Sequence, residues 1–444
     1  MVRSVTPAGR VPGPRFFALS DRASIIAGVA MLVPALLIYA WLAVHRISGF
    51  APWLADSLRR VIGVEGVARL EEAVYGVEDS LNSVVRRGEK PRAYWEVPPE
   101  AAPAATRASV ARALVGPAVA AAPLVDALPI ETAPSVDAPP PVLPRQPALP
   151  HFRPRNVGPM FTELDAPGDG RWVVLADDGS GDPRMYKTLL HPDAERAWAE
   201  LFVVALDLRR VRLHFVPGTL EPQATVDDAV DLPRPGRVPD EDHAGVLAAF
   251  NGGFKTEHGH YGTYFNGVTV VPPLTDTCTI ALTKDNTLRI GTWSKLDREA
   301  REGAWWRQTP GCMYEDGKIN PRLAGGRVSK WGSTIDGETV IRRSAIGVDA
   351  AGTTLFVGIS NHTTAPAIAQ GMRHAGATTI AQLDINFSYP KFVSFRDSAT
   401  TKQKVAVPLA EGFEYAEGEY LRKPSQRDFF YVMDSSMDGR TARN

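Results

Sequence analysis

An uncharged run of 22 residues, Ala23 to Val44, constrains this chain more than any other feature. As a helix rising about 1.5 Å per residue, it would span roughly 30 Å, the thickness of the hydrocarbon layer of a bilayer. A transmembrane helix tolerates Pro34, and Tyr39 and Trp41 lie near one end, where amphipathic rings favour the membrane interface. We therefore expect residues 23–44 to form a single transmembrane helix.

A cleavable signal peptide is the alternative for this run. Its apolar region would usually be shorter, and no clear small-x-small cleavage site comes before His45 and Arg46. Arginines occur on both sides, with more on the leading side, at Arg3, Arg10, Arg15 and Arg22. The positive-inside bias therefore favours residues 1–22 in the cytoplasm, an inner-membrane anchor, and a C-terminal domain outside the cytoplasm.

Residues 50–88 have the pattern of an amphipathic juxtamembrane helix. Apolar residues recur at spacings of three and four, and charged residues fill the gaps. The apolar positions are Leu54, Leu58, Val61, Val64, Val67, Leu70, Val74, Val77 and Leu81. Gly63, Gly66 and Gly76 weaken the helix. Packing of the apolar face against a neighbouring element and pairing with a second copy as a homodimer are both open.

Residues 89–155 form a linker rich in proline and alanine, with Pro139, Pro140 and Pro141 in a row. Proline fixes φ and has no backbone N–H, so we expect this segment to be extended and disordered. At about 3.1 Å per residue it could reach on the order of 100–200 Å. We interpret it as a spacer that holds residues 156–434 away from the membrane.

Residues 156–434 are long enough to bury a sizeable core. Short β-rich runs bounded by Asp, Gly and Asn predict the α+β class, a mixed β-rich domain with a few helices. The runs are 171–176, 200–208, 211–218, 278–283, 287–293, 345–350 and 354–360. One strong helix, 365–375, ends at Gly376 and leads into the apolar run 377–385, so we expect a local βαβ-like unit.

Composition argues against several partners and cofactors. The formal net charge is −1, which leaves no basic footprint for nucleic acid. Cys278 and Cys312 are too few for a disulfide framework and badly spaced for zinc, so one disulfide and two buried thiols are both open. His258 and His260 could ligate a metal, but no third ligand is evident, and we expect no metal. The absence of a phosphate-binding loop agrees with our expectation of no cofactor.

Four segments of the domain are informative both by their residues and by their order along the chain. They are "AAFNGGFK" (248–255), "GCMYEDGKINP" (311–321), "RRSAIGVDAAGTTLFVGI" (342–359) and "HAGATTIAQLDIN" (374–386). The series resembles the phosphodiester glycosidase family, relatives of the lysosomal N-acetylglucosamine-1-phosphodiester alpha-N-acetylglucosaminidase. The resemblance covers roughly residues 203–394. It implies cleavage of the bond between an anomeric carbon and a phosphate oxygen.

The resemblance extends to individual residues. Family members have an Asn-Gly-Gly-Phe turn, matched by residues 251–254, and an Arg before a small-apolar-Gly strand, matched by Arg343. Of the family's Leu-Asp-Gly-Gly-Gly-Ser signature, only Leu383 and Asp384 match, because residues 385–388 are Ile-Asn-Phe-Ser. This looks like a Leu-Asp-Ile-Asn subgroup of bacterial envelope proteins. The missing glycines would let a backbone approach a ligand closely, so the family's original substrate does not carry over.

The implied reaction needs carboxylates and a cation. Glycoside cleavage normally uses two carboxyl groups, and we expect Asp384 and Glu257 to be the catalytic pair. A phosphate is already a good leaving group, so a cation that grips it matters more than an acid, and Arg343 could do this through its planar fork. The other substrate-binding candidates are Asn251, Gly252 and Asn386.

Structural roles compete with each assignment. Asp384 could cap the turn after its strand, Arg343 could pair with a structural acid, and Glu257 could be a solvated loop residue. Two functions remain open for the same reason. One is a membrane-anchored envelope hydrolase acting on phosphodiester-linked sugars of a cell-surface glycan, and the other is a non-catalytic glycan-binding or structural envelope module. A pocket blocked by Phe387 or Tyr389 would favour the second.

Overall fold

The computed structural model describes residues 39, 50–89, 93, 95–97, 151–176, 181–324, 339–386 and 388–438. Residues 1–22, nearly all of the expected anchor at 23–44 and most of the expected linker lie outside the described residues. Within the described ranges, no helix has both the length and the apolar character needed to cross a membrane.

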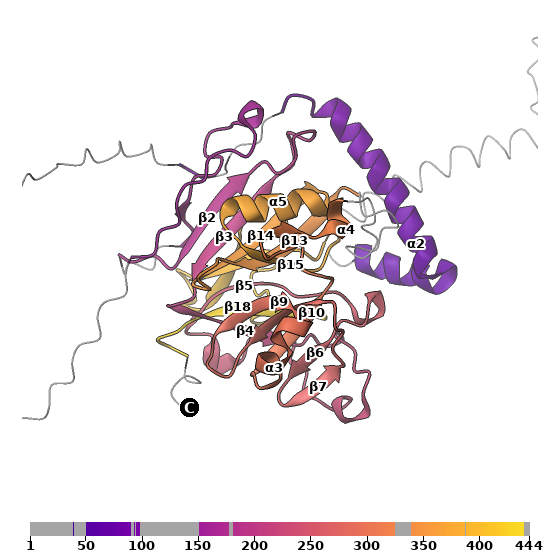
Figure 1. Cartoon of the computed structure of the whole chain (residues 1–444), viewed down its shortest axis with the longest axis vertical. Helices are drawn as coiled ribbons and strands as arrows, with labels where there is room; N and C mark the ends of the chain where they lie inside the picture. Colours follow the sequence, from indigo (N-terminus) through magenta and orange to yellow (C-terminus); the bar gives the residue numbers. More distant parts are fainter. Residues whose placement is uncertain are drawn as a thin grey trace, which may run out of the picture.

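Three antiparallel sheets build the domain (Figure 1). Sheet A has eight strands, in the order β1 (Val173–Val174), β2 (Met185–Leu190), β3 (Leu201–Asp207), β14 (Thr354–Thr363), β13 (Ile341–Val348), β15 (Thr379–Gln382), β11 (Tyr314–Glu315) and β12 (Lys318–Ile319). Sheet B has five, in the order β17 (Lys404–Pro408), β16 (Phe392–Asp397), β5 (Val246–Asn251), β18 (Phe429–Asp434) and β4 (Val211–Val216). Sheet C also has five, in the order β7 (Val268–Val271), β6 (Thr263–Phe265), β10 (Trp305–Thr309), β8 (Cys278–Leu282) and β9 (Leu288–Thr292).

Few helices accompany these sheets, which confirms the β-rich, mixed class. They are α2 (Phe50–Val85), α3 (Trp293–Arg301), α4 (Pro321–Ala324) and α5 (Ala365–Ala375). Short 3₁₀ turns are η1 (Thr162–Leu164), η2 (Asp227–Ala229), η3 (Asp240–Asp242) and η4 (Thr256–His258).

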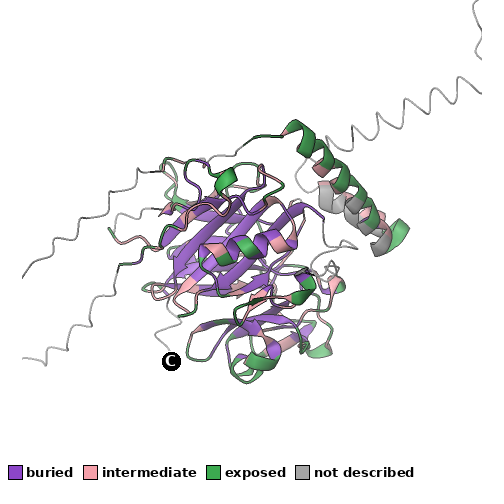
Figure 2. Ribbon diagram, turned by 45° about the horizontal axis from the view of Figure 1, so that its top comes forward, coloured by how far each residue is buried: buried purple, intermediate pink, exposed green. Residues whose placement is uncertain are grey.

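Sheet A lies between α5 and the other sheets, so its central strands are covered on both faces (Figure 2). Phe202 and Val204 of β3 pack into the core shared with sheets B and C, whereas Val203 and Ala205 pack against α5. This explains why the run 200–208 is continuously apolar rather than alternating, because both faces of a doubly covered strand must be apolar.

The expected βαβ-like unit is present as β14, α5 and β15. Both strands pair antiparallel with β13, which lies between them, so they run parallel to each other. Thr364 caps the start of α5 by accepting a hydrogen bond from the backbone N–H of Ala367 at 3.3 Å. Gly376 ends the helix with φ of 119°, a conformation that glycine adopts readily.

A disulfide joins Cys278 and Cys312, the alternative that the sequence left open. Cys278 begins β8 of sheet C, and Cys312 precedes β11 of sheet A. The bond therefore ties two sheets together across a sequence separation of 34 residues.

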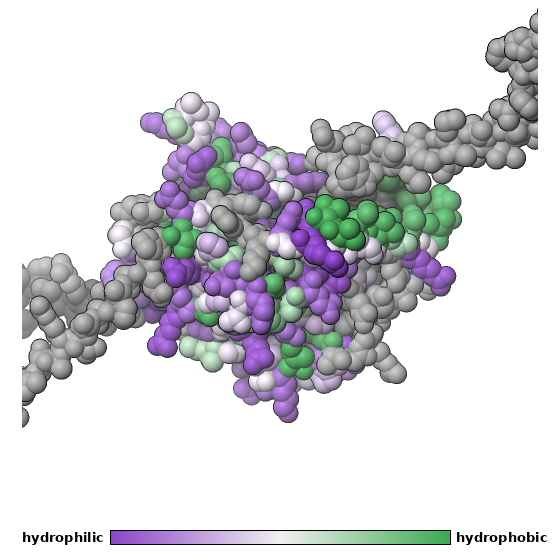
Figure 3. Space-filling view, turned by 90° about the horizontal axis from the view of Figure 1, so that it is seen from above, coloured by the Kyte–Doolittle hydropathy of each residue, from purple (hydrophilic) through white to green (hydrophobic). Residues whose placement is uncertain are grey.

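The structure has a helix where residues 50–88 predict one, and it is interrupted at Gly63, whose φ of 74° is not helical. The apolar positions of α2 do not form one inward face: Val67 is buried, but Leu70, Val74, Val77 and Leu81 are all exposed (Figure 3). The helix also contacts the domain through an ion pair and one aromatic ring, described below. Pairing with a second copy through α2 stays a prediction.

Two aromatic residues inside the predicted linker pack against the domain. Trp95 lies 6.1 Å from Phe202, ring centroid to ring centroid, and Phe152 lies 5.7 Å from Tyr186. Both ends of the segment 89–155 therefore contribute to the packed structure, because a large ring gains more from burial than the chain loses by ordering a few residues. The described part of the domain likewise extends past residue 434, to Asp438.

Candidate active site

The Asn-Gly-Gly-Phe turn follows β5 and lies against the start of β18. The Gly252 N–H donates to the backbone oxygen of Asp428 at 2.9 Å, and the Gly253 N–H donates to Asp428 Oδ2 at 3.1 Å. A Cβ added to Gly252 would lie 2.5 Å from the Asp428 oxygen, and one added to Gly253 would lie 2.9 Å from the Arg307 guanidinium. Both positions therefore require glycine because neighbouring atoms leave no room for a Cβ, not because the backbone needs a conformation that only glycine adopts.

Asn251 joins this turn to β13 and to the segment that follows β15. Its side-chain amide donates to Ser344 Oγ at 2.8 Å, and the Ser344 hydroxyl donates to the backbone oxygen of Asp384 at 2.9 Å. Its amide oxygen accepts the N–H of Lys391 at 3.1 Å. Fully buried and bonded on both sides, Asn251 fixes the position of Asp384 through the polypeptide backbone.

Asp384 is the buried carboxylate at this junction, with only 2% of its surface exposed. Its N–H donates to the Gly252 oxygen at 3.0 Å, and its Oδ2 pairs with Nη2 of Arg427. Burial raises the pKa of Asp384 above its ordinary value, although the charges of Arg427 and His258 act in the opposite direction. A carboxylate in this setting is a stronger base than an exposed one.

Arg427 is the cation beside Asp384. Its guanidinium lies 4.5 Å from the centre of the Tyr389 ring and contacts the Gly253 oxygen at 3.4 Å. Burial acts to lower the pKa of Arg427, but Asp384, Tyr389 and Asp428 together raise it, so the group is a permanent cation. Its side chain as a whole retains 11% exposure.

Asp428 and Arg307 form a second charged pair directly behind the first. Arg307 Nε donates to Asp428 Oδ2 at 2.9 Å, and both side chains are almost fully buried. The Tyr389 hydroxyl donates to the backbone oxygen of Asp428 at 3.0 Å, so the ring that supports Arg427 is anchored to the neighbouring residue. Tyr389 thus lies beneath the charged centre and holds it in place.

Three buried polar atoms at this centre make no hydrogen bond to any residue within the described ranges. They are Arg427 Nε, Asp428 Oδ1 and His258 Nε2. Buried polar groups are nearly always satisfied, and unsatisfied ones concentrate where a ligand or water completes the bonding. The arrangement can therefore accept additional donors and acceptors from a bound molecule.

Glu257 lies in η4, two residues after Lys255, and its side chain is 44% exposed. Its Oε1 is 3.6 Å from Lys255 Nζ and 3.5 Å from His258 Nε2. The charge of His258 is among the causes that lower the pKa of Asp384. Glu257 is a partly exposed carboxylate beside His258 in η4.

Arg343 and Asn386 make contacts that serve the backbone. Arg343 is fully buried, and its guanidinium donates to the carbonyl oxygens of Thr363 and Thr339 at 3.0 and 2.9 Å. Its neighbour Ser344, on the opposite face of β13, is the residue that reaches Asp384. The Asn386 side chain accepts the N–H groups of Ser388 and Tyr389 at 2.9 and 2.6 Å, as in an Asx turn.

The structure thus brings Asn251, Gly252 and Asp384 together, as the sequence predicts. It adds four residues that sequence reasoning missed: Arg427, Asp428, Arg307 and Tyr389. The one available signal was the charged pair Arg-Asp directly before the apolar run "FFYV", which is also typical of an ordinary turn.

Comparison with known proteins confirms the resemblance found in the sequence. Residues 244–384 match the model of the phosphodiester glycosidase family. The matched segment contains the Asn-Gly-Gly-Phe turn, Ser344 and Asp384, whereas Arg427 and Asp428 lie beyond it. No curated protein matches this chain.

Three solved structures are similar to part of the chain. The zebrafish N-acetylglucosamine-1-phosphodiester alpha-N-acetylglucosaminidase catalytic domain, auto-inhibited by its pro-peptide, has a TM-score of 0.37 and 14% identity over 59% of this chain and 86% of that one. A hypothetical protein from Synechocystis has a TM-score of 0.30 and 11% identity, covering 56% and 62%. A putative exported protein from Burkholderia pseudomallei K96243 has a TM-score of 0.23 and 9% identity, covering 53% and 74%. At these scores the likenesses carry no argument here.

Proposed function

We propose that this protein hydrolyses phosphodiester-linked sugars of a cell-surface glycan, at the centre formed by Asp384 and Arg427. The observation that carries the proposal is this pair itself, a buried carboxylate and the guanidinium of a partly exposed arginine held against the Asn-Gly-Gly-Phe turn. The carboxylate and the turn belong to the segment that matches the phosphodiester glycosidase family.

In the proposed reaction the bond between the anomeric carbon and the phosphate oxygen breaks. Water supplies the hydroxyl group of the released sugar and a proton to the phosphate product. Arg427 holds the phosphate and stabilises the negative charge that develops on it, as a fixed cation in a water-poor site can. Asp384, with its raised pKa, acts at the anomeric carbon as the nucleophile or as the base that activates water.

Glu257 is the proposed second carboxylate, since it follows the Asn-Gly-Gly-Phe turn by only a few residues and its side chain is 44% exposed. Its Oε1 lies 3.5 Å from His258 Nε2. Arg427 Nε, which makes no hydrogen bond to any described residue, is suited to bind a phosphate oxygen.

The test is turnover of a panel of sugar-1-phosphodiesters by the wild-type protein and by Asp384→Asn. The substitution is nearly isosteric, so we expect a folded protein whose kcat falls by about 10²–10⁴-fold. Equal turnover by the two proteins would remove Asp384 from the chemistry. Binding of the panel without any turnover by the wild-type protein would favour the non-catalytic glycan-binding module.

Membrane anchoring by residues 23–44 is a second part of the proposal, and it rests on the uncharged run in the sequence. Deleting Met1 to Arg46 should move the protein from the membrane fraction to the soluble fraction, because no later run is long and apolar enough to span a bilayer. A truncated protein that still behaves as an integral membrane protein would contradict a single anchor there.

A further inference from the structure

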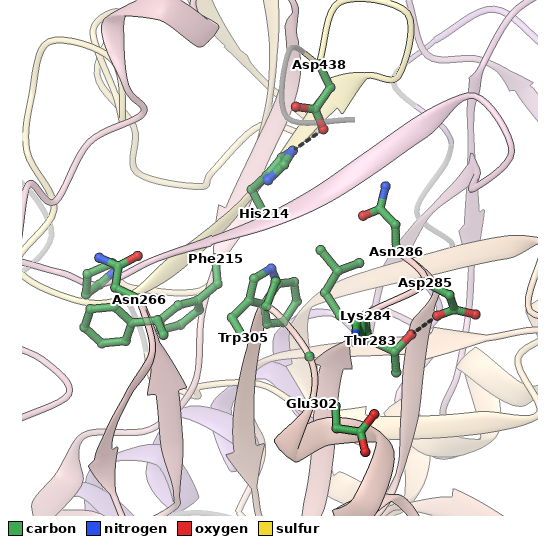
Figure 4. Close-up of a pocket in the computed structure, with 15 residues that line it drawn as sticks. His214, Phe215, Asn266, Thr283, Lys284, Asp285, Asn286, Glu302, Trp305 and Asp438 are labelled. Carbon is green, nitrogen blue, oxygen red and sulfur yellow. Dashed lines mark hydrogen bonds and ion pairs between the residues drawn. The ribbon is translucent and has the colours of Figure 1, made fainter. Parts of the chain in front are cut away.

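A pocket of about 640 Å³ lies between edge strand β4 and the two hairpin turns of sheet C. Figure 4 shows the side chains that line it. The volume falls within the range of small-molecule sites, about 300–1,000 Å³. Neither Asp384 nor Arg427 lines this pocket, so it is separate from the proposed active site.

The inner wall of the pocket is aromatic. Phe215 lies 6.0 Å from Trp305 and 5.8 Å from Phe265, ring centroid to ring centroid. The Trp305 indole N–H is buried and makes no hydrogen bond to any residue in the described part of the chain. In Figure 4 its nitrogen is turned toward the side where His214 lies. A buried donor without an acceptor, placed at a pocket wall, indicates that something else supplies the acceptor.

The rim is polar and carries more acid than base. Asn266 and Asn286 stand at the tips of the β6–β7 and β8–β9 hairpins, where their φ angles of 52° and 62° suit asparagine. The lining residues include three acids, Asp285, Glu302 and Asp438, and one lysine, Lys284. The remaining base, His214, is already engaged by Asp438 at 3.2 Å.

Together these features indicate which class of ligand the pocket can bind. An anion would meet three carboxylates, and their repulsion disfavours phosphate or an acidic sugar. A purely apolar ligand would leave the amides and the indole N–H unpaired. A neutral sugar has hydroxyl groups that both donate and accept, and its C–H face can lie against an apolar wall.

We propose that this pocket binds a neutral saccharide, with the indole N–H of Trp305 and the amides of Asn266 and Asn286 bonding its hydroxyl groups. The assignment goes beyond the proposed hydrolysis and does not depend on it. On a glycan substrate, this site would hold a neutral sugar unit while the phosphodiester lies at Arg427.

The experiment uses the full-length protein with ¹⁵N-labelled tryptophan, titrated with cellobiose, maltose, chitobiose and mannobiose. The Trp305 indole signal is assigned by its loss in Trp305→Phe. We expect at least one disaccharide to shift this signal downfield, because the N–H gains an acceptor. The double variant Asn266→Gly/Asn286→Gly should weaken that binding about tenfold, as expected for two lost hydrogen bonds. Glycine keeps the positive φ at both sites, so the turns remain.

Lys402→Gly is the matched control, because Lys402 also has a positive φ, of 55°, and follows β16 at the opposite edge of sheet B. It should bind as the wild type does. Asp384→Asn should also bind the disaccharide as the wild type does. Binding at this pocket can therefore be judged whether or not the proposed reaction occurs. No shift with any disaccharide, or binding that is unchanged in the double variant, would each overturn the proposal.

Discussion

At the scale of single residues, we propose for Arg427 the phosphate-binding role that the sequence predicted for Arg343. The Arg427 side chain contacts Asp384 and retains some exposed surface, whereas Arg343 is fully buried and donates to main-chain oxygens. A phosphate can reach only a cation that retains some accessible surface. The structure therefore favours Arg427 as the phosphate-binding group.

Replacing each arginine by lysine separates these roles. Lysine keeps the charge but loses the planar fork, so Arg427→Lys should raise KM for a sugar phosphodiester by about tenfold or more, with a smaller change in melting temperature. Arg343→Lys should instead lower the melting temperature and leave kcat/KM per folded molecule unchanged, since lysine cannot satisfy two backbone oxygens with the same geometry. Steady-state kinetics and thermal melting of both variants provide the comparison. The reverse pattern would indicate that Arg343, and not Arg427, binds the phosphate.

The sequence predicted part of this centre for a physical reason. Asn251, Gly252 and Asp384 belong to short motifs whose order along the chain is itself informative. Arg427 and Asp428 are distant from these motifs in sequence and reach them only because β18 pairs with β5. Strand pairing across this separation depends on the whole sheet, so no local pattern around residue 427 reveals it.

At the scale of elements, α2 meets the domain through polar as well as apolar residues. Asp79 accepts two hydrogen bonds from Arg196, both at 2.8 Å, and Tyr75 packs against Phe254, Ile341 and Ile385. The spacing of apolar residues predicted the helix but not these contacts, because Asp79 and Tyr75 lie outside the predicted apolar positions.

The pKa of His362, near the end of β14, is affected by charged residues in and next to α2. Burial lowers its pKa to about 4, and Arg86 and Arg342 act in the same direction while Asp79 opposes them. The unfolded state binds a proton near pH 6.5, so the protein should lose stability as pH falls from about 6.5 toward 4. The loss attributable to this group is on the order of 2–3 kcal/mol.

Urea unfolding at pH 7 and pH 5 tests this expectation in the wild type and in His362→Gln. Glutamine cannot take up the proton, so the variant should lose less stability between the two pH values. Identical losses in both proteins would show that His362 is not held neutral by the fold.

The prediction of a βαβ-like unit succeeded at this scale because its signals are local. The helix 365–375 has a capping threonine before it and a glycine after it, and the strands on either side are short apolar runs. The arrangement of three sheets could not be predicted in the same way. It depends on which β-rich runs pair, and runs of similar length and composition do not specify their partners.

At the scale of the whole molecule, the disulfide between Cys278 and Cys312 couples sheet C to sheet A. The disulfide closes a loop of 34 residues and so lowers the conformational entropy of the unfolded chain. This should stabilise the native state relative to the unfolded chain by about 3–4 kcal/mol. Dithiothreitol should therefore lower the melting temperature of the wild-type protein. The variant Cys278→Ala/Cys312→Ala, which has no cysteine left, should melt at the same temperature with and without the reductant. A wild-type protein insensitive to complete reduction would contradict this coupling.

The central claim is that the centre at Asp384 and Arg427 breaks the bond between an anomeric carbon and a phosphate oxygen. The most direct test is hydrolysis of a sugar-1-phosphodiester in water enriched with ¹⁸O, followed by mass spectrometry of both products. We predict that the label enters the released sugar at its anomeric hydroxyl, and that Asp384→Asn releases no labelled sugar at an appreciable rate. Label in the phosphate would show cleavage of the phosphorus–oxygen bond and would contradict the account.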